Sequence, residues 1–335
     1  MSRDSLDNSS VNNSEAWWIT GQGKGDILAA PVDACPPGFD GDAVTVETLF
    51  SGVSRGTESL VFQGQVPESE YGRMRAPFQQ GSFPFPVKYG YANVGRVVAG
   101  PAHFQGNAVF CLFPHQARYR VPAEAVACLP EGLPPARAVL AANMETAING
   151  LWDGGPGIGD RIAVVGLGVV GLLVAWLANR IPGTRVTAVD INPDRRAVAE
   201  RLGLTFASTV EQDDHDLVFH ASGHASGLNT ALELAGPESV IVEMSWYGEA
   251  VVEVPLGKAF HSRRLTIRSS QVGQISPLRQ PRWNYQKRME LALDLLRDDT
   301  LDALISGKTR FGEMPETMSK ILTDGSHTLC HRIVY

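Results

Sequence analysis

Three glycines, Gly166, Gly168 and Gly171, have the spacing Gly-x-Gly-x-x-Gly, with Val169 and Val170 between the last two. In a strand–turn–helix unit the first glycine permits a tight turn, the second lets the backbone approach a pyrophosphate, and the third lets the helix pack on the sheet. The unpaired N–H groups at the start of that helix favour phosphate groups. The motif therefore predicts a dinucleotide site at these five residues.

An acidic residue, Asp190, follows Gly171 at the distance expected for the end of the next strand. A carboxylate there accepts hydrogen bonds from the ribose hydroxyls and repels a 2'-phosphate, so we predict NAD as the cofactor and regard NADP as less favoured. Arg195 and Arg196 weaken this preference only slightly. A glycine-rich turn that binds no nucleotide remains the alternative.

The elements that must position these residues change in character along the chain. From 16 to 142 short β-rich segments alternate with Gly and Pro, as at 43–49, 95–100 and 107–113. Beyond that point strands at 161–165, 185–190, 217–221 and 239–244 alternate with helices at 169–179, 193–202 and 227–234, which predicts a parallel sheet covered on both faces. We expect an α/β protein.

The predicted domain organisation has four parts. Residues 1–15 are polar and are expected to be a disordered tail, 16–142 form a β domain, 143–276 form the NAD-binding domain, and 277–335 return to the first domain. The returning segment contains an expected helix at 285–297 and an expected strand at 329–334. The segment 54–86 is expected to be a long loop that carries binding residues.

Composition excludes several classes of function. The chain has 335 residues, 44% apolar and 19% charged, with a net charge of −7 and no long basic run, which argues against nucleic acid as a partner. The N-terminus lacks the apolar core of a signal peptide. The uncharged stretch 162–178 is better explained by a strand and a buried helix than by a membrane span. We expect a cytoplasmic protein without membrane contact.

The motif and the order of elements resemble the medium-chain dehydrogenase/reductase (zinc-type alcohol dehydrogenase-like) superfamily over roughly 16–335. The resemblance implies a GroES-like β domain plus a Rossmann domain with a doubly wound parallel sheet. Ser222 and Gly223 match a segment beside the cofactor, and Ile191 and Ser245 complete the expected cofactor residues. Segments 50–58, 88–95 and 268–273 are similar to the group around 2-desacetyl-2-hydroxyethyl bacteriochlorophyllide a dehydrogenase, whose substrate does not transfer by similarity.

The zinc ligands of the superfamily have no counterparts in this chain. The first ligand, a Cys, falls on Ser54 or Arg55, the His of the usual Gly-His-Glu segment falls on Tyr91, and the third ligand falls on Ala142. Zinc in proteins needs thiolate, imidazole or carboxylate donors in number. We therefore predict a metal-free site.

Hydride transfer develops charge on a substrate oxygen, which zinc would otherwise stabilise. Tyr91 is the first choice as hydrogen-bond donor or general acid, and Arg55 would stabilise negative charge or bind an anionic substrate. By the resemblance, Thr57 matches a hydroxyl that relays protons and Glu58 matches a carboxylate beside the metal, which here could simply pair with Arg55. For Tyr91 a packed aromatic remains the alternative. The full set of candidates is Arg55, Thr57, Glu58, Tyr91, Asn93 and Glu145.

Other side chains form a competing set. Each histidine taken singly is more simply explained as structural, although His115 and His261 remain catalytic candidates and His220 is expected in the core near the cofactor. Trp246 and Tyr247 are expected near the nicotinamide. The loop 64–86 alternates aromatics with arginines, which suits a flat or anionic substrate and equally a lid packed on its own domain.

We thus predict a metal-free, NAD-dependent oxidoreductase of the medium-chain type that acts on an alcohol or ketone of a ring-containing small molecule. The alternatives are an NADPH-dependent quinone or enone reductase and, in a different class, a non-catalytic protein that senses the dinucleotide. By resemblance alone we expect a homodimer that pairs sheet edges near the strand beginning around 265.

Overall fold

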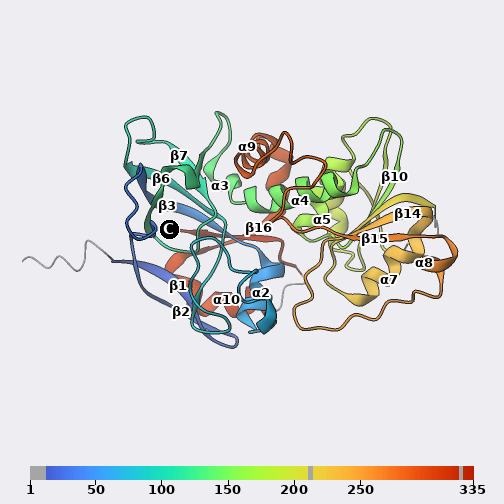
Figure 1. The fold of residues 1–335 in the computed structure, drawn as a ribbon, viewed down its shortest axis with the longest axis horizontal. Coiled ribbons are helices and arrows are strands. Elements are labelled where there is room, and N and C mark those ends of the chain that lie inside the picture. Colours follow the sequence, from blue (N-terminus) through green and yellow to red (C-terminus); the bar gives the residue numbers. More distant parts are fainter. Residues whose placement is uncertain (1–12, 210–213, 324–326) are drawn as a thin grey trace, which may run out of the picture. The chain divides into compact units, whose positions relative to one another are not determined.

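The structure, a computed structural model, describes residues 13–209, 214–323 and 327–335 and divides into two compact units (Figure 1). Unit 1 comprises 1–140 and 307–335, and unit 2 comprises 141–306. Both contain mixed helix and strand, so the α/β class is confirmed. No helix in the described ranges is long and apolar enough to cross a membrane.

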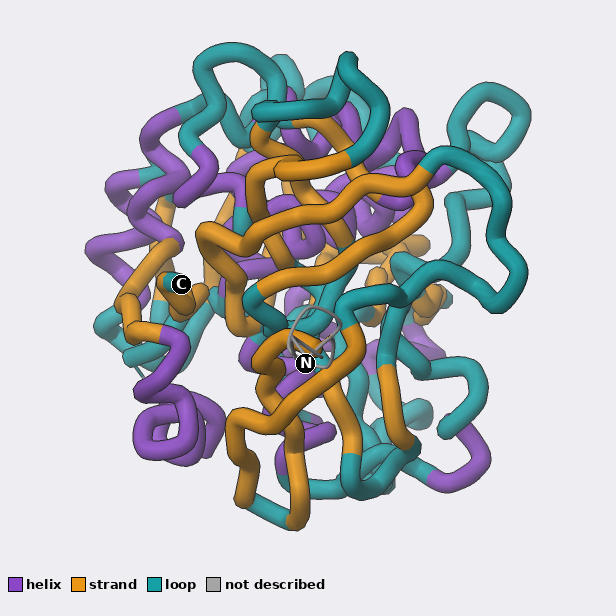
Figure 2. The backbone as a smooth tube through the Cα atoms, turned by 90° about the vertical axis from the view of Figure 1, so that its left-hand side faces the viewer, coloured by secondary structure: helices purple, strands orange, loops and turns teal. Residues whose placement is uncertain are grey.

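Antiparallel strands dominate unit 1, whose sheets face the viewer in Figure 2. One sheet has the order β2-β1-β5-β4, and the other has the order β16-β17-β3-β6-β7-β9, with β8 paired to β3. The strands are β1 (Asn13–Gly21), β2 (Lys24–Pro31), β3 (Ala43–Val53), β4 (Gln80–Gly81), β5 (Val87–Lys88), β6 (Asn93–Ala99), β7 (Ala108–Cys111), β8 (Arg118–Pro122), β9 (Val126–Cys128), β16 (Ile305–Arg310) and β17 (Cys330–Val334).

Helices and a packed apolar layer complete unit 1. The helices are α2 (Arg55–Phe62), α3 (Pro135–Ala138) and α10 (Met314–Thr323). The central strand β3 alternates buried and more exposed positions over its first half, as expected of a strand with one face on the core. Its inward residues join neighbours from β6, β7 and β8 in a buried cluster that includes Val44, Val46, Val97, Val109, Phe113, Tyr119 and Val121.

Unit 2 is built on a parallel sheet with the strand order β12-β11-β10-β13-β14-β15. The order reverses between β10 and β13, and Figure 1 shows α4 and α5 on one side of the sheet and α7 and α8 on the other. The strands are β10 (Arg161–Val165), β11 (Arg185–Val189), β12 (Thr205–Ala207), β13 (His215–His220), β14 (Ala235–Glu243) and β15 (Thr266–Ser269). The helices are α4 (Ala141–Gly154), α5 (Val169–Ala178), α6 (Arg195–Arg201), α7 (Ala225–Leu234), α8 (Ala259–Ser262) and α9 (Tyr285–Leu295).

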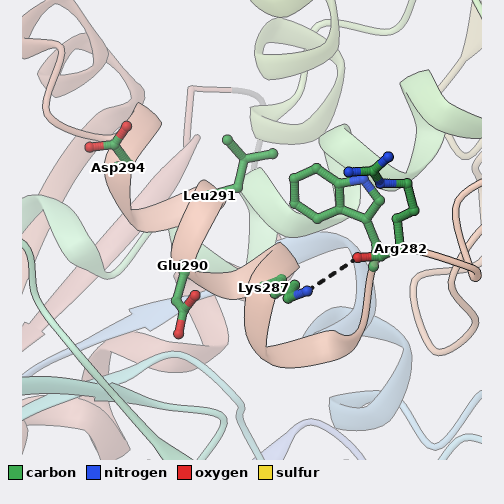
Figure 3. A pocket seen from close by; sticks show the side chains of 6 residues that line it. Arg282, Lys287, Glu290, Leu291 and Asp294 are labelled. Atoms are coloured by element: carbon green, nitrogen blue, oxygen red, sulfur yellow. Dashed lines mark hydrogen bonds between the residues drawn. The ribbon is translucent and has the colours of Figure 1, made fainter.

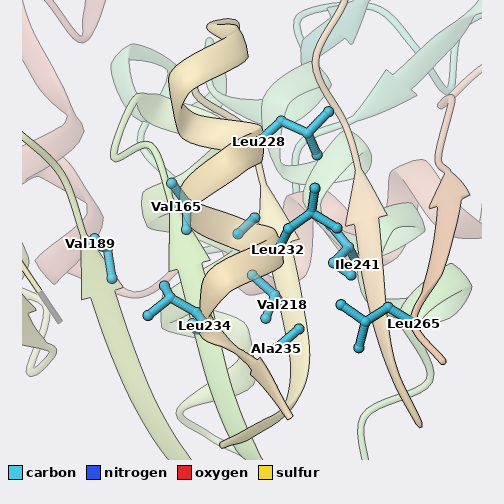
Figure 4. Packing of buried hydrophobic residues seen from close by; sticks show 11 residues of the cluster. Val165, Val189, Val218, Leu228, Leu232, Leu234, Ala235, Ile241 and Leu265 are labelled. Carbon is cyan, nitrogen blue, oxygen red and sulfur yellow. The ribbon is translucent and has the colours of Figure 1, made fainter. Parts of the chain in front are cut away.

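The apolar side of α7 packs on this sheet. Leu228 and Leu232 point from the helix toward Val165, Val218 and Ile241 on three neighbouring strands (Figure 4). All five side chains are almost fully buried. Each fully buried side chain of this kind contributes about 1.5–3 kcal/mol relative to exposure. This packing anchors the strands whose carboxyl ends carry the glycine motif and Ser222.

Three boundary predictions differ from the structure. The return to unit 1 begins at 307 rather than 277, because α9 packs against α4 within unit 2. Residues 13–15 of the expected tail belong to β1, paired with β2, while the rest of that tail lies outside the described residues. The expected loop 54–86 contains α2, which buries Glu58, Val61 and Phe62.

Candidate active site

The glycine motif lies in the turn between β10 and α5. Gly166 has φ +95°, and a Cβ there would meet the Ser222 backbone within 2.5 Å, so only glycine fits. At Gly171 a Cβ would lie 1.9 Å from the Gly166 carbonyl oxygen. Gly168, in contrast, is exposed and its Cβ position is open, which leaves room for a ligand to approach the backbone. Val169 and Val170 begin α5.

The Asp190 carboxylate follows β11 and faces this turn. Its Oδ2 accepts from the Leu167 N–H at 2.6 Å and its Oδ1 accepts from the Asn192 N–H at 2.8 Å. A carboxylate has about four acceptor positions, so two remain for hydroxyl donors. The neighbouring Ile191 is 90% exposed, and its apolar side chain offers a surface to an adenine-sized group. Arg195, by contrast, is buried.

The strands β13 and β14 end in a network of polar side chains. His220 Nε2 lies 2.6 Å from Ser222 Oγ, and His220 Nδ1 lies 2.7 Å from Glu243 Oε2. Tyr247 donates to the same Glu243 oxygen at 3.0 Å. His220 is fully buried, in agreement with the expected core position, but its two polar partners were not expected. The hydrogen bond to His220 holds the pKa of Glu243 below its usual range, against the effect of burial.

Two further cofactor candidates lie at the same edge of the sheet. The Gly223 N–H donates to Ser245 Oγ at 3.1 Å, and the Ser245 N–H donates to Glu243 at 2.7 Å. The carboxyl ends of β10, β11, β13 and β14 therefore bring together the ten predicted cofactor residues. Such an edge, at the point where strand order reverses, is where open α/β sheets bind ligands.

In unit 1, Tyr91 lies close to the start of α2. Its hydroxyl is hydrogen-bonded to Ser54 and Thr57, so two of the predicted catalytic residues meet. Burial, together with the nearby charge of Glu58, raises the pKa of Tyr91 to about 12. The phenol is therefore protonated at neutral pH and can donate a hydrogen bond.

Glu58 does not pair with Arg55, contrary to one of the alternatives from sequence. Its Oε2 lies 3.0 Å from His115 Nε2, and its Oε1 accepts from the Ser54 N–H at 2.7 Å. Both side chains of the Glu58–His115 pair are at most 3% exposed. Among the described residues Arg55 makes no ion pair, and burial lowers its pKa.

The other predicted catalytic residues are engaged elsewhere. Glu145, in unit 2, forms a buried ion pair with Arg288 Nε at 2.9 Å. Burial nevertheless raises the pKa of Glu145, against the effect of Arg288. Asn93 is fully buried and accepts from Tyr119 at 3.1 Å. These contacts fit structural roles.

The aromatics of the loop 64–86 pack on unit 1. Phe78 contacts Phe113 at 5.3 Å between ring centroids, and Tyr71 contacts Phe83 at 5.6 Å. Phe83 in turn contacts Tyr89, whose ring meets Tyr91 edge-on at 6.0 Å. The packed-lid alternative thus describes these side chains, and the series of rings buttresses Tyr91.

Two surface cavities have no predicted cofactor residue in their lining. One, of about 470 Å³, is lined by side chains of α9 and the turn before it, among them Arg282, Lys287, Glu290 and Asp294 (Figure 3). Its lining is mainly exposed and charged, and Lys287 donates to the Arg282 carbonyl at 3.4 Å. The other, of about 350 Å³, belongs to unit 1 and includes Tyr335.

Known proteins share this arrangement. No family model matches the chain. L-idonate 5-dehydrogenase (NAD(P)(+)) of Escherichia coli strain K12 is 26% identical over 172 residues, which is 46% of this chain and 48% of that protein. The chain thus matches about half the length of this curated relative. Galactitol-1-phosphate dehydrogenase of Escherichia coli superimposes with a TM-score of 0.76 at 17% identity, over 96% of this chain and 100% of that one.

An acetophenone reductase of Geotrichum candidum, solved with NAD, superimposes with a TM-score of 0.74 at 14% identity over 97% and 98% of the two chains. This chain has the medium-chain dehydrogenase fold. The GroES-like and Rossmann domains expected from sequence are confirmed as units 1 and 2. Of these proteins, L-idonate 5-dehydrogenase uses NAD or NADP, and the acetophenone reductase was solved with NAD.

Zinc, the usual metal of medium-chain enzymes, does not fit the side chains found here. No group of three or more His, Cys, Asp or Glu residues arranged for a metal occurs in the described ranges. At the expected ligand positions stand Arg55, whose guanidinium repels a cation, and Tyr91, whose phenol remains protonated. Ala142 offers no donor at all.

Proposed function

We propose that the chain is an NAD-preferring oxidoreductase that transfers hydride between the nicotinamide and an alcohol or ketone of a ring-containing small molecule, without a metal. The proposal also places it in the zinc-free branch of the superfamily. The observations that carry it are the open Gly168 turn and the protonated Tyr91, which stands where the resemblance to the superfamily leads us to expect a zinc ligand.

The cofactor half of the proposal rests on the edge of the unit 2 sheet. The Gly166–Gly171 turn and the N-terminus of α5 would hold the pyrophosphate, and Asp190 would accept the ribose hydroxyls. Asp190 is already oriented by the Leu167 N–H, which aligns its carboxylate with the turn. Bound NAD supplies the hydride acceptor or donor.

The substrate half rests on Tyr91. Charge develops on the substrate oxygen during hydride transfer, and a positioned donor stabilises that charge. The Tyr91 phenol can donate to this oxygen, while Ser54 and Thr57 hold its hydroxyl in place. Arg55, half-buried and without a carboxylate partner among the described residues, adds positive charge nearby on α2.

Cofactor titration tests the first half. We expect purified, chelator-treated protein to bind NADH more tightly than NADPH, followed by cofactor fluorescence, and the untreated protein to contain no stoichiometric zinc by mass spectrometry. Preferred NADPH would favour the quinone or enone reductase instead. Stoichiometric zinc would contradict the metal-free mechanism.

Tyr91→Phe tests the second half. With cyclic and aryl alcohols and ketones as a panel, we expect turnover in the wild type and a loss of about 10²-fold or more in kcat in the variant. We expect NADH affinity to stay the same, because all of the predicted cofactor residues belong to unit 2 and Tyr91 belongs to unit 1. Tyr285→Phe, an exposed change in unit 2, is the control. NADH binding without any turnover would favour a dinucleotide sensor.

We further propose a homodimer. In the described residues β15 is an edge strand of the unit 2 sheet, so its outer backbone groups are free to pair with a second copy. Light scattering checks the mass in solution, and a monomer at micromolar concentration would contradict the dimer.

A further inference from the structure

A chain of hydrogen bonds crosses unit 1 from α2 to the last residue. Glu58 Oε2 lies 3.0 Å from His115 Nε2, and His115 Nδ1 lies 2.6 Å from Ser51 Oγ. Ser51 Oγ in turn lies 3.1 Å from the Tyr335 hydroxyl. The hydroxyl groups of Ser51 and Tyr335 can both donate and accept a hydrogen bond. The Glu58 carboxyl group and the His115 ring nitrogens change between donor and acceptor when they gain or lose a proton.

The order carboxylate, histidine, serine is also that of a nucleophilic triad. Such a site requires a serine oxygen that a substrate can reach. Ser51 is 0% exposed, lies within β3, and pairs through its backbone with β6 and β17. Attack on a substrate by this hydroxyl is therefore excluded by burial. A continuous series of buried hydrogen bonds of this kind can still transfer protons.

The two ends of the chain differ in their surroundings. At the inner end Glu58 and His115 are at most 3% exposed, and Glu58 directly follows Thr57, one of the two residues hydrogen-bonded to Tyr91. At the outer end Tyr335 is half-buried and lines the cavity of about 350 Å³ together with Glu15, Ala117, Arg310, Phe311 and Val334. The chain thus runs from the candidate catalytic tyrosine toward solvent.

We propose that Glu58, His115, Ser51 and Tyr335 form a proton relay that exchanges a proton between the surroundings of Tyr91 and water at the Tyr335 end. In the outward direction the Glu58 carboxyl proton moves to His115 Nε2, and the Nδ1 proton moves to Ser51. The former Ser51 proton moves to Tyr335, whose own proton passes to water. Each O–H or N–H bond that breaks is matched by one that forms, and no electrons are transferred.

The titratable groups around the relay are suited to passing a proton on. Tyr89, Tyr91 and Cys330 face Glu58, and burial together with its charge raises the pKa of each of them. Tyr119 faces Tyr335, and its pKa is raised by burial. Arg332 is the nearby cation and acts on Cys330. These phenols and the thiol are therefore already protonated at neutral pH, so none of them takes up the proton that Glu58 passes on.

The use of this relay in catalysis rests on the proposed function, because dehydrogenation releases a proton that must reach solvent. The relay itself can be measured without cofactor or substrate. In protein labelled with ¹⁵N-histidine, NMR gives the rate at which the His115 ring N–H exchanges with water, and the signal is assigned by its loss in His115→Gln.

Tyr335→Phe is the principal variant, because it keeps the ring that stacks on Phe311 at 4.5 Å and removes only the hydroxyl. We expect exchange at His115 to slow by about tenfold or more. Ser51→Ala interrupts the same chain one link further in and should slow exchange similarly, so it decides the matter if Tyr335→Phe does not fold. Tyr285→Phe, exposed and in unit 2, should leave the rate unchanged.

The direction of the change separates a relay from a structural role. A variant that merely loosens packing admits water and speeds exchange. Unchanged or faster exchange in Tyr335→Phe, or in Ser51→Ala, would overturn the proposal. If both variants slow exchange at His115 but the wild type binds neither NADH nor NADPH, the relay is supported and the oxidoreductase function is rejected. The two failures are therefore distinguishable.

Discussion

At the scale of single residues, partners decide what each side chain can do. Glu58 and Arg55 lie three residues apart on one short helix, yet Glu58 binds His115, while Arg55 has no carboxylate partner in the part of the chain that the structure describes. Tyr91 is held by two hydroxyl-bearing neighbours and remains a phenol at neutral pH. Glu145, chosen for its position in a motif, is bound to Arg288. These contacts support our proposal that Tyr91 is the donor to a substrate oxygen.

Lys88 is a buried base outside this site. It is fully buried, donates to Gln116 Oε1 at 2.5 Å, and lies over the Phe113 ring at 5.0 Å. Burial lowers its pKa to about 7. Between this pKa and the unfolded value of about 10.4 the unfolded chain binds more protons, so stability rises with pH across this window.

Lys88→Met should remove this rise. We expect the free energy of unfolding of the wild type to increase by roughly 3–4 kcal/mol from Lys88 between pH 7 and pH 10, and the variant to lack that contribution. Urea unfolding at several pH values measures it. The exposed change Lys287→Met is the control, and parallel pH curves for wild type and Lys88→Met would refute the prediction.

At the scale of elements, the β10–α5 turn separates what the fold needs from what a ligand needs. Gly166 and Gly171 are required by contacts within the protein, since a Cβ at either would meet backbone atoms. Gly168 is not required by such contacts, because a Cβ at this position would meet no atom of the protein within 4 Å. A single motif thus contains both structural and binding glycines, and substitution can tell them apart.

Gly168→Ala should leave the thermal midpoint within about 2 °C of the wild type and weaken NADH binding about tenfold or more, because the new methyl group occupies the approach to the backbone. Gly171→Ala should lower the free energy of unfolding by about 2 kcal/mol or more through its clash with the Gly166 carbonyl. Calorimetry and fluorescence titration measure the two effects. Equal NADH affinity in Gly168→Ala would refute the predicted approach of the pyrophosphate.

At the scale of the whole molecule, the chain builds each unit around its own core. Unit 1 closes only when 307–335 adds β17 to the sheet next to β3, so the first and last parts of the sequence fold together. Unit 2 is continuous in sequence and contains all of the predicted cofactor residues. We therefore expect a bound cofactor to stabilise unit 2 directly.

NADH at 100 times its Kd should stabilise the protein by about 2.7 kcal/mol, as expected for one site on the folded state. The same concentration of NADPH should stabilise it less, because Asp190 disfavours a 2'-phosphate. A chelator should leave the unfolding transition unchanged, because the side chains present do not form a zinc site. Scanning calorimetry measures the unfolding transition with NADH, with NADPH and with the chelator. An unfolding temperature lowered by the chelator would contradict the expectation that the protein has no zinc site.

The sequence by itself determined most of the alternating strands and helices of unit 2, although α4 and β12 were not predicted. Alternating strands and helices, a glycine motif and a following aspartate are local patterns, and the observed β10, α5 and β11 match the predicted ranges to within a residue or so. Local patterns suffice there because backbone geometry and helix or strand period depend on neighbouring residues. The helix α2 and the boundary at 307 were missed because no local signal marked them.

Only the tertiary structure decided the partners of the polar groups. Ser51 and Tyr335 are 284 residues apart and meet because β17 pairs with β3 in a register that sets Ile333 opposite Ser51. Likewise the partner of Glu58 is a histidine 57 residues away rather than the arginine on its own helix. Strand register and helix facing arise from the packing of the whole unit, since a shift of one residue would turn each side chain to the other face.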